Sequence, residues 1–119
     1  MEFNFAIKND MLVLKGQAKC VTGNVNSYIC KFEILTNSEL TWLCVFKQDE
    51  NAYQQVIENG KCVIPKEVLE QAKDIQIGCY ATNGDMRIST NWIEFNVVRG
   101  HIPRQLLLMN RLRMYGKHL

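Results

Sequence analysis

The sequence predicts an all-β protein: an immunoglobulin-like antiparallel β-sandwich with one short internal helix and a C-terminal α-helix. Through residues 1–98, apolar residues alternate with polar ones in short runs, and turn signals separate the runs at intervals of about 8–12 residues. Before the tail, only residues 65–72 could form a helix, which excludes the alternating strands and helices of an α/β fold. The 119 residues, 47% hydrophobic and 22% charged, suffice for one ordered domain with a core and hardly for a second.

The first two strands follow directly from the N-terminus. Residues 3–7 alternate between apolar and polar side chains, which indicates a strand with one buried face. Asn9 and Asp10 are a turn signal, and residues 11–14 resume as a second strand, which we expect to extend past Gly16 as far as Cys20. Residues 22–27 form a polar loop.

The middle of the chain contains the clearest strand. Tyr28, Cys30, Phe32 and Ile34 fall on one face of residues 28–34, and polar residues dominate the other. Residues 40–46 are apolar on both faces and predict a central strand, and residues 53–57 return as its neighbour. Asn59-Gly60 is a strong signal for a type I′ turn, which needs positive φ at both residues.

The last third combines a short helix with a closing hairpin. Residues 62–64 form a short β run, and Pro65 can occupy the first position of a helix of one or two turns. Residues 75–81 predict a buried strand. A Gly84-Asp85 turn then leads into a last strand over residues 86–98, in which Thr90 and Asn91 could bend the chain.

Charge divides the chain into a body, residues 1–98, and a tail, residues 99–119. The body holds nine Lys/Arg and twelve Asp/Glu, a net charge of −3, whereas the tail holds five basic residues and no acid, which restores the total of +2. Such asymmetry usually marks a segment with a partner of its own.

The tail predicts a helix over residues 104–115, after Pro103 and before Gly116. Its apolar side chains spread over most of the circumference, and a helix of this kind is normally buried on several sides. We therefore predict a protein-docking helix in which leucines supply binding energy and arginines set register; phosphate contacts to nucleic acid are the less favoured alternative. The predicted docking residues are Arg104, Leu106, Leu107, Leu108, Arg111, Leu112, Arg113, Met114 and Tyr115.

No motif predicts catalysis, a metal or a cofactor. The five cysteines lack C-x-x-C spacing and alternate with polar residues, so we expect buried, reduced thiols. The histidines, His101 and His118, lie in the tail, and the phosphate-binding and hydrolase motifs are absent from the sequence. Trp42 and Trp92 are expected to pack in the core or at a sheet edge, and Arg87 to pair with an acid on a neighbouring strand.

Several short stretches in a fixed order resemble a known family. They are Tyr28-x-Cys30-x-Phe32, Trp42 ahead of Phe46, Gly60-x-Cys62-x-Ile64-Pro65-x-x-Val68-Leu69, Ile77-Gly78-x-Tyr80, and Arg87-Ile88-Ser89-Thr90-Asn91-Trp92. In this order they resemble the β-sandwich domain of tail-tip and baseplate proteins of phages that infect Gram-positive bacteria, such as the N-terminal domain of baseplate upper proteins. Members of that family usually continue into a coiled-coil stalk, whereas this sequence ends after one basic segment.

The resemblance implies a non-enzymatic virion component, first at the tail tip or baseplate, whose partners are other virion proteins or copies of itself in a symmetric assembly. Capsid decoration is one alternative, and a carbohydrate- or host-surface-binding module with aromatic residues in a groove is another. Neither a signal peptide nor an apolar run long enough for a transmembrane helix is evident, so we expect assembly in the host cytoplasm and residence in the virion.

Overall fold

A computed structural model describes residues 1–16, 19–22 and 28–100, which form strands and one short 3₁₀ helix. No helix within these ranges is long and apolar enough to cross a bilayer. The elements in chain order are β1 (Glu2–Lys8), β2 (Met11–Lys15), β3 (Lys19–Val21), β4 (Ile29–Ile34), β5 (Trp42–Gln48), β6 (Asn51–Val56), β7 (Lys61–Val63), η1 (Lys66–Leu69), β8 (Ile75–Asn83), β9 (Met86–Ser89) and β10 (Ile93–Val98).

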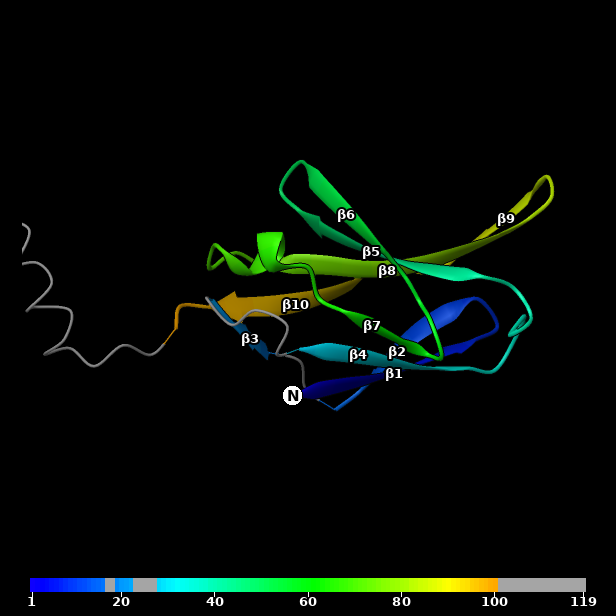
Figure 1. Cartoon of the computed structure of the whole chain (residues 1–119), viewed down its shortest axis with the longest axis horizontal. Helices are drawn as coiled ribbons and strands as arrows, with labels where there is room; N and C mark the ends of the chain where they lie inside the picture. Colours follow the sequence, from blue (N-terminus) through cyan, green and yellow to red (C-terminus); the bar gives the residue numbers. More distant parts are fainter. Residues whose placement is uncertain (17–18, 23–27, 101–119) are drawn as a thin grey trace, which may run out of the picture.

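The strands form two sheets that face each other as a sandwich (Figure 1). The four-stranded sheet has the order β2-β1-β4-β7. The six-stranded sheet has the order β3-β10-β8-β5-β6, and β9 pairs with β8 beyond the end of β10. The expectation of an all-β sandwich is therefore confirmed, and β5 is an internal strand as predicted.

The expectation of a wholly antiparallel sandwich is wrong, because both sheets are mixed. β4 pairs with β1 in parallel, and β3 pairs with β10 in parallel. The physical cause is that the chain enters the second sheet after β2 and forms β3 there. It then returns to the first sheet as β4, which pairs with the free edge of β1 and runs in the same direction as β1. Pairings between strands far apart in sequence leave no local pattern, and alternation alone could not reveal them.

The core lies between the two sheets and is rich in aromatic rings. Phe5 stacks on Phe32 within its own sheet and on Phe95 of the opposite sheet, with ring centroids 5.0 and 5.6 Å apart. Phe3 meets the edge of Phe95 at 5.2 Å. Trp42 is 1% exposed, and its indole N–H donates to the backbone oxygen of Asn37. Its predicted place in the core is confirmed.

Residues with positive φ form the turns where the sequence predicted them. Asn9 and Asp10, with φ of 51° and 62°, join β1 to β2. Asn59 and Gly60, with φ of 52° and 72°, form the predicted two-residue turn, which Glu58 and Lys61 close by hydrogen bonds in both directions. This turn does more than join neighbours, because it carries the chain from β6 in one sheet to β7 in the other.

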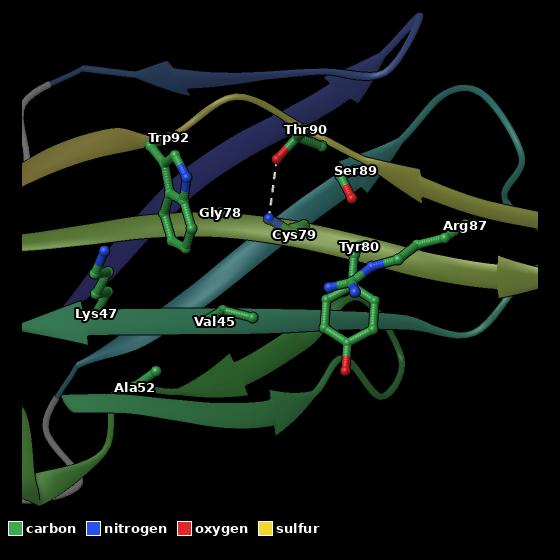
Figure 2. A pocket seen from close by; sticks show the side chains of 10 residues that line it. All are labelled: Val45, Lys47, Ala52, Gly78, Cys79, Tyr80, Arg87, Ser89, Thr90 and Trp92. Carbon is green, nitrogen blue, oxygen red and sulfur yellow. Dashed lines mark hydrogen bonds between the residues drawn. The ribbon is translucent and has the colours of Figure 1, made fainter. Parts of the chain in front are cut away.

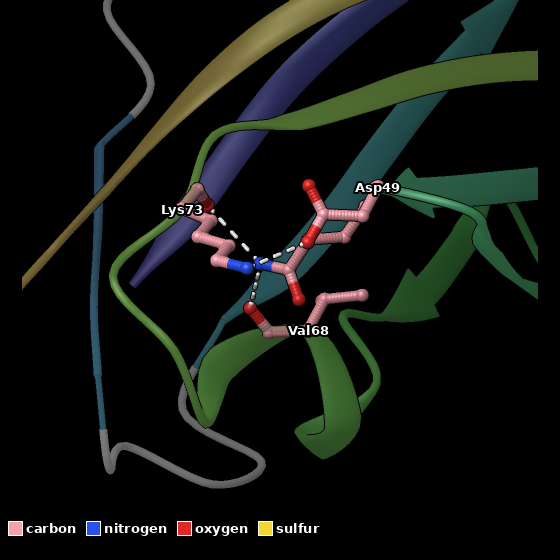
Figure 3. A network of polar contacts seen from close by, with 4 residues as sticks. Asp49, Val68 and Lys73 are labelled. Carbon is pink, nitrogen blue, oxygen red and sulfur yellow. Dashed lines mark hydrogen bonds and ion pairs between the residues drawn. The ribbon is translucent and has the colours of Figure 1, made fainter.

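The predicted short helix is η1, and a buried glutamine holds it. The side-chain amide of Gln48 donates to the backbone oxygens of Val68 and Lys73, at 3.0 and 3.1 Å. The ammonium of Lys73 forms an ion pair with Asp49 at 2.8 Å (Figure 3). Pro65 is extended, with ψ of 141°, so it precedes the helix instead of occupying its first position.

Two strand boundaries differ from the expectation. β2 ends at Lys15, because Gly16 has φ of +92° and turns the chain away, so Cys20 belongs to β3 in the other sheet. The last strand is not continuous over residues 86–98. It is broken at Thr90–Trp92 into β9 and β10, and this break shapes the surface described next.

Candidate functional site

The predicted docking tail lies outside the described residues. This applies to the predicted C-terminal helix and to each of its docking side chains, Arg104, Leu106, Leu107, Leu108, Arg111, Leu112, Arg113, Met114 and Tyr115. The point where the tail begins is described. The backbone N–H of Thr22 donates to Val98 and that of Gly100 donates to the Thr22 hydroxyl at 2.8 Å, so the end of β10 is fixed beside β3.

A β-bulge interrupts the pairing of β8 with the last strands. Tyr80 pairs with Ser89 of β9, and Ile77 pairs with Ile93 of β10. Between these two pairs, β8 contributes two residues and the opposite segment contributes three. One extra residue is therefore present on the β9–β10 side. A bulge of this kind bends the strand and changes the direction of its side chains.

Thr90 and Asn91 hold the bulge in place. The Thr90 hydroxyl accepts a hydrogen bond from the backbone N–H of Cys79 and donates to the backbone oxygen of Asn91. The Asn91 side chain reaches the other sheet, where its Oδ1 accepts from the Leu12 N–H at 2.7 Å and its Nδ2 donates to the Leu12 oxygen at 3.2 Å. The expected bend is confirmed, and Asn91 also connects the two sheets.

Directly after the bulge, Trp92 lies over Gly78. A Cβ added to Gly78 would lie 3.0 to 3.3 Å from three atoms of the six-membered part of the indole, so the ring packs against glycine backbone. Trp92 nevertheless remains 49% exposed. The expectation that Trp92 packs in the core or at a sheet edge is wrong: the ring stands on the outer face of the six-stranded sheet, over its central strand β8.

An open groove of about 440 Å³ lies on this outer face. That volume falls within the range of about 300–1,000 Å³ found for small-molecule sites. Figure 2 shows Trp92 with Lys47 towards one end and Tyr80 with Arg87 towards the other, with Val45 between them. The groove is lined by Val45, Lys47, Ala52, Gly78, Cys79, Tyr80, Arg87, Ser89, Thr90 and Trp92.

Tyr80 and Arg87 form one wall of the groove. The Arg87 guanidinium carbon lies 4.3 Å from the centroid of the Tyr80 ring, and the Tyr80 hydroxyl donates to the side-chain oxygen of Gln54. The expected ion pair of Arg87 with an acid on a neighbouring strand is wrong, because the described residues place a ring, not a carboxylate, against the guanidinium.

Positive charge dominates the groove. Lys47 and Arg87 line it, no carboxylate does, and neither cation takes part in an ion pair with another described residue. Glu94 shares a row of the sheet with Lys47: Glu94 pairs with Gln76, which in turn pairs with Lys47. Two strand spacings of about 4.8 Å therefore separate the Glu94 and Lys47 backbones.

A cluster of thiols fills part of the core beneath this sheet. All five cysteines are free and buried, as predicted. Cys30 lies opposite Cys62 in one sheet, and Cys44 lies opposite Cys79 in the other. Cys44 and Cys62 interact electrostatically across the core, which connects the two pairs.

The thiols differ in how easily they ionise. Burial raises the pKa of Cys20 to about 12 and also raises the pKa of Cys44. The hydrogen bond to Cys62, together with burial, raises the pKa of Cys30. Hydrogen bonds from Cys30 and Cys44 lower the pKa of Cys62.

The thiol cluster does not form a metal centre. In the described part of the chain, no group of three or more His, Cys, Asp or Glu side chains has an arrangement that could hold a metal ion. Three carboxylates, Glu67, Glu70 and Asp74, lie on or beside η1; Glu67 is partly buried and the other two are exposed.

Sequence reasoning missed the groove, although one signal could have indicated it. Gly78 sits between apolar residues inside a predicted strand, where a glycine often marks a bulge or a close approach. The partner in that approach, Trp92, is fourteen residues further on, and only the hairpin register brings the two residues together. No protein-family model and no curated protein sequence matches this chain.

Proposed function

We propose that this protein is a non-enzymatic structural component of a phage virion, at the tail tip or baseplate, that docks through its C-terminal tail onto other virion proteins or copies of itself. The ordered set of short stretches from Tyr28 to Trp92 supports the virion assignment by resemblance. We also propose that the sandwich belongs to the immunoglobulin-like kind, which its two facing sheets support.

One observation carries the docking proposal: the described body makes its own core. The buried hydrophobic residues run from Phe3 to Val97 and come from both sheets. The tail begins at Arg99, at the fixed end of β10, and carries a net charge of +5 against −3 for the body. A basic, leucine-rich segment that begins where the core is already complete is suited to bind another surface.

The first test is the solution mass of the intact chain and of a 1–102 truncation, measured by light scattering at two salt concentrations. We expect the truncated body to remain folded, with an unchanged near-ultraviolet circular dichroism spectrum. If the intact chain is an oligomer and the truncation a monomer, the tail is a self-assembly element. If both are monomers, the tail docks on a different protein.

An unfolded truncation would contradict the proposal, because the tail would then belong to the core of its own domain. A variant with Lys66 changed to Gln provides the control. It removes one exposed charge from the body and leaves the tail intact, so it should associate as the unchanged chain does.

A further inference from the structure

We propose that the groove between Trp92 and Arg87 binds an acidic saccharide, with a sugar ring against the indole and its carboxylate or phosphate groups held by Arg87 at one end of the groove and by Lys47 at the other. This site belongs to the body alone, and the inference holds whether or not the tail docks in a virion.

The groove contains a preformed aromatic surface. The bulge directs Trp92 over Gly78, and the absence of a Cβ there lets the indole rest on the backbone. The ring is thus supported from below while 49% of the residue stays exposed. Aromatic side chains with a few well-placed polar groups are typical of small-molecule sites, and the C–H face of a pyranose ring is an apolar surface of matching size.

Positive charge surrounds this ring. Lys47 and Arg87 belong to different strands, β5 and β9, and both reach the same groove, in which the lining includes no acid. Arg87 is oriented by the Tyr80 ring at 4.3 Å, so part of its conformational freedom is already lost before a ligand binds. Charge-assisted hydrogen bonds from such groups to a carboxylate or phosphate are about twice as strong as neutral ones.

Neutral polar side chains lie near the cations. The Ser89 hydroxyl lines the groove, and the side-chain amide of Gln54 meets the Tyr80 hydroxyl at its edge. Hydroxyl and amide groups are suited to the hydroxyl groups of a sugar, because each can both donate and accept.

The same surface could in principle stack a nucleobase and contact a phosphate. The charge of the body argues against a nucleic acid, since a net charge of −3 repels a long polyanion while a short ligand with one or two acidic groups can still meet the local cations. The saccharide is therefore the ligand class that the described residues favour.

The test uses the full chain and Trp92 itself as the reporter. Trp42 is buried, so a ligand in the groove should change mainly the emission of Trp92. The probes are trigalacturonate, 3′-sialyllactose and glucose 6-phosphate, each compared with a neutral counterpart: methyl-esterified trigalacturonate, lactose and glucose. We expect at least one acidic probe to give a saturable change and its neutral counterpart to bind about tenfold or more weakly, a difference of about 1.4 kcal/mol.

Two exposed substitutions test the charges without risk to the core. Arg87→Gln and Lys47→Gln should each weaken the binding of trigalacturonate, which carries several carboxylates, by about tenfold, about 1.4 kcal/mol, and leave its methyl-esterified counterpart nearly unchanged. Lys61→Gln on β7, in the other sheet, is the matched control and should bind as the unchanged protein does. Gly78→Ala should weaken acidic and neutral probes alike, because its Cβ displaces the indole.

Three results would overturn the proposal. No acidic probe binds with saturation; or Arg87→Gln and Lys47→Gln bind as tightly as Lys61→Gln; or an oligothymidylate of six nucleotides binds more tightly than every saccharide. The last result would assign the groove to single-stranded nucleic acid instead.

Discussion

At the scale of single residues, Asn91 links features of the fold that the chain otherwise keeps apart. Its side chain pairs with both backbone groups of Leu12, and β2 is an edge strand whose outer side would otherwise lack a partner there. A side-chain amide thus takes the place of one residue of a neighbouring strand. The same residue belongs to the bulge that directs Trp92, so the inter-sheet contact and the groove depend on one another.

We expect Asn91→Ala to lower the free energy of unfolding by about 1–3 kcal/mol, because it leaves the N–H and oxygen of Leu12 without partners. Asn91→Asp keeps the acceptor but places a carboxylate against the Leu12 oxygen, so it should destabilise at least as much. Urea denaturation measures both variants, and Asn4→Ala on the exposed side of β1 is the control. Equal midpoints for Asn91→Ala and Asn4→Ala would show that the amide contact contributes nothing.

The buried thiol of Cys20 predicts a pH dependence. In the folded protein, burial raises the pKa of Cys20 to about 12, whereas in the unfolded chain the thiol ionises near its ordinary pKa of 9. The unfolded state therefore loses its proton first. The free energy of unfolding is undiminished below pH 9 and falls as the pH rises from 9 towards 12, by at most about 1.4 kcal/mol per pH unit for this group.

Cys20→Ala should reduce this slope, whatever it does to stability at pH 7. The measurement is the free energy of unfolding from urea denaturation between pH 8 and pH 11 under reducing conditions. Curves for the two proteins that stay parallel across this range would contradict the expected role of Cys20.

At the scale of elements, the sequence predicted best the features that depend on neighbours along the chain. Alternation identified β1 and β4, because each has one buried face, and positive-φ residues identified the turns at Asn9 and Asn59. The same reasoning missed the parallel pairs and the bulge at Thr90–Trp92. Both arise from contacts between distant segments, such as β1 with β4 and Gly78 with Trp92, and a local period does not encode them.

Two glycines provide a matched test of the turn that changes sheets. Gly60 and Gly84 both have positive φ, at 72° and 62°, but a Cβ on Gly60 would lie 3.0 Å from the backbone oxygen of Phe32, whereas Gly84 has open space. Gly84→Ala should therefore cost about 1–2 kcal/mol, the penalty of the left-handed conformation alone. Gly60→Ala should cost clearly more, because backbone cannot move aside as a side chain can. Thermal denaturation of both variants checks the order, and an equal cost would mean that the β6–β7 connection adjusts freely.

At the scale of the whole molecule, the body and the tail are predicted to have separate roles. The body presents a preformed groove on one face and closes its core between its sheets. The tail is basic and leucine-rich, and its predicted role could be stated from the sequence because composition and charge are properties of a segment, independent of its contacts. The groove could not be predicted from the sequence, because it depends on the register of β8, β9 and β10.

The two kinds of tail residue should have separable effects on association. Leu107→Asp with Leu112→Asp should abolish docking at every salt concentration, because each fully buried leucine contributes about 1.5–3 kcal/mol. Arg111→Gln with Arg113→Gln should instead slow association and reduce its dependence on salt, while the final mass of the complex stays the same. Stopped-flow and static light scattering measure the rate and the mass for a self-assembling chain. The reverse pattern, with the arginine variant unable to associate and the leucine variant unaffected, would make the tail an electrostatic element and favour a polyanionic partner over a protein surface.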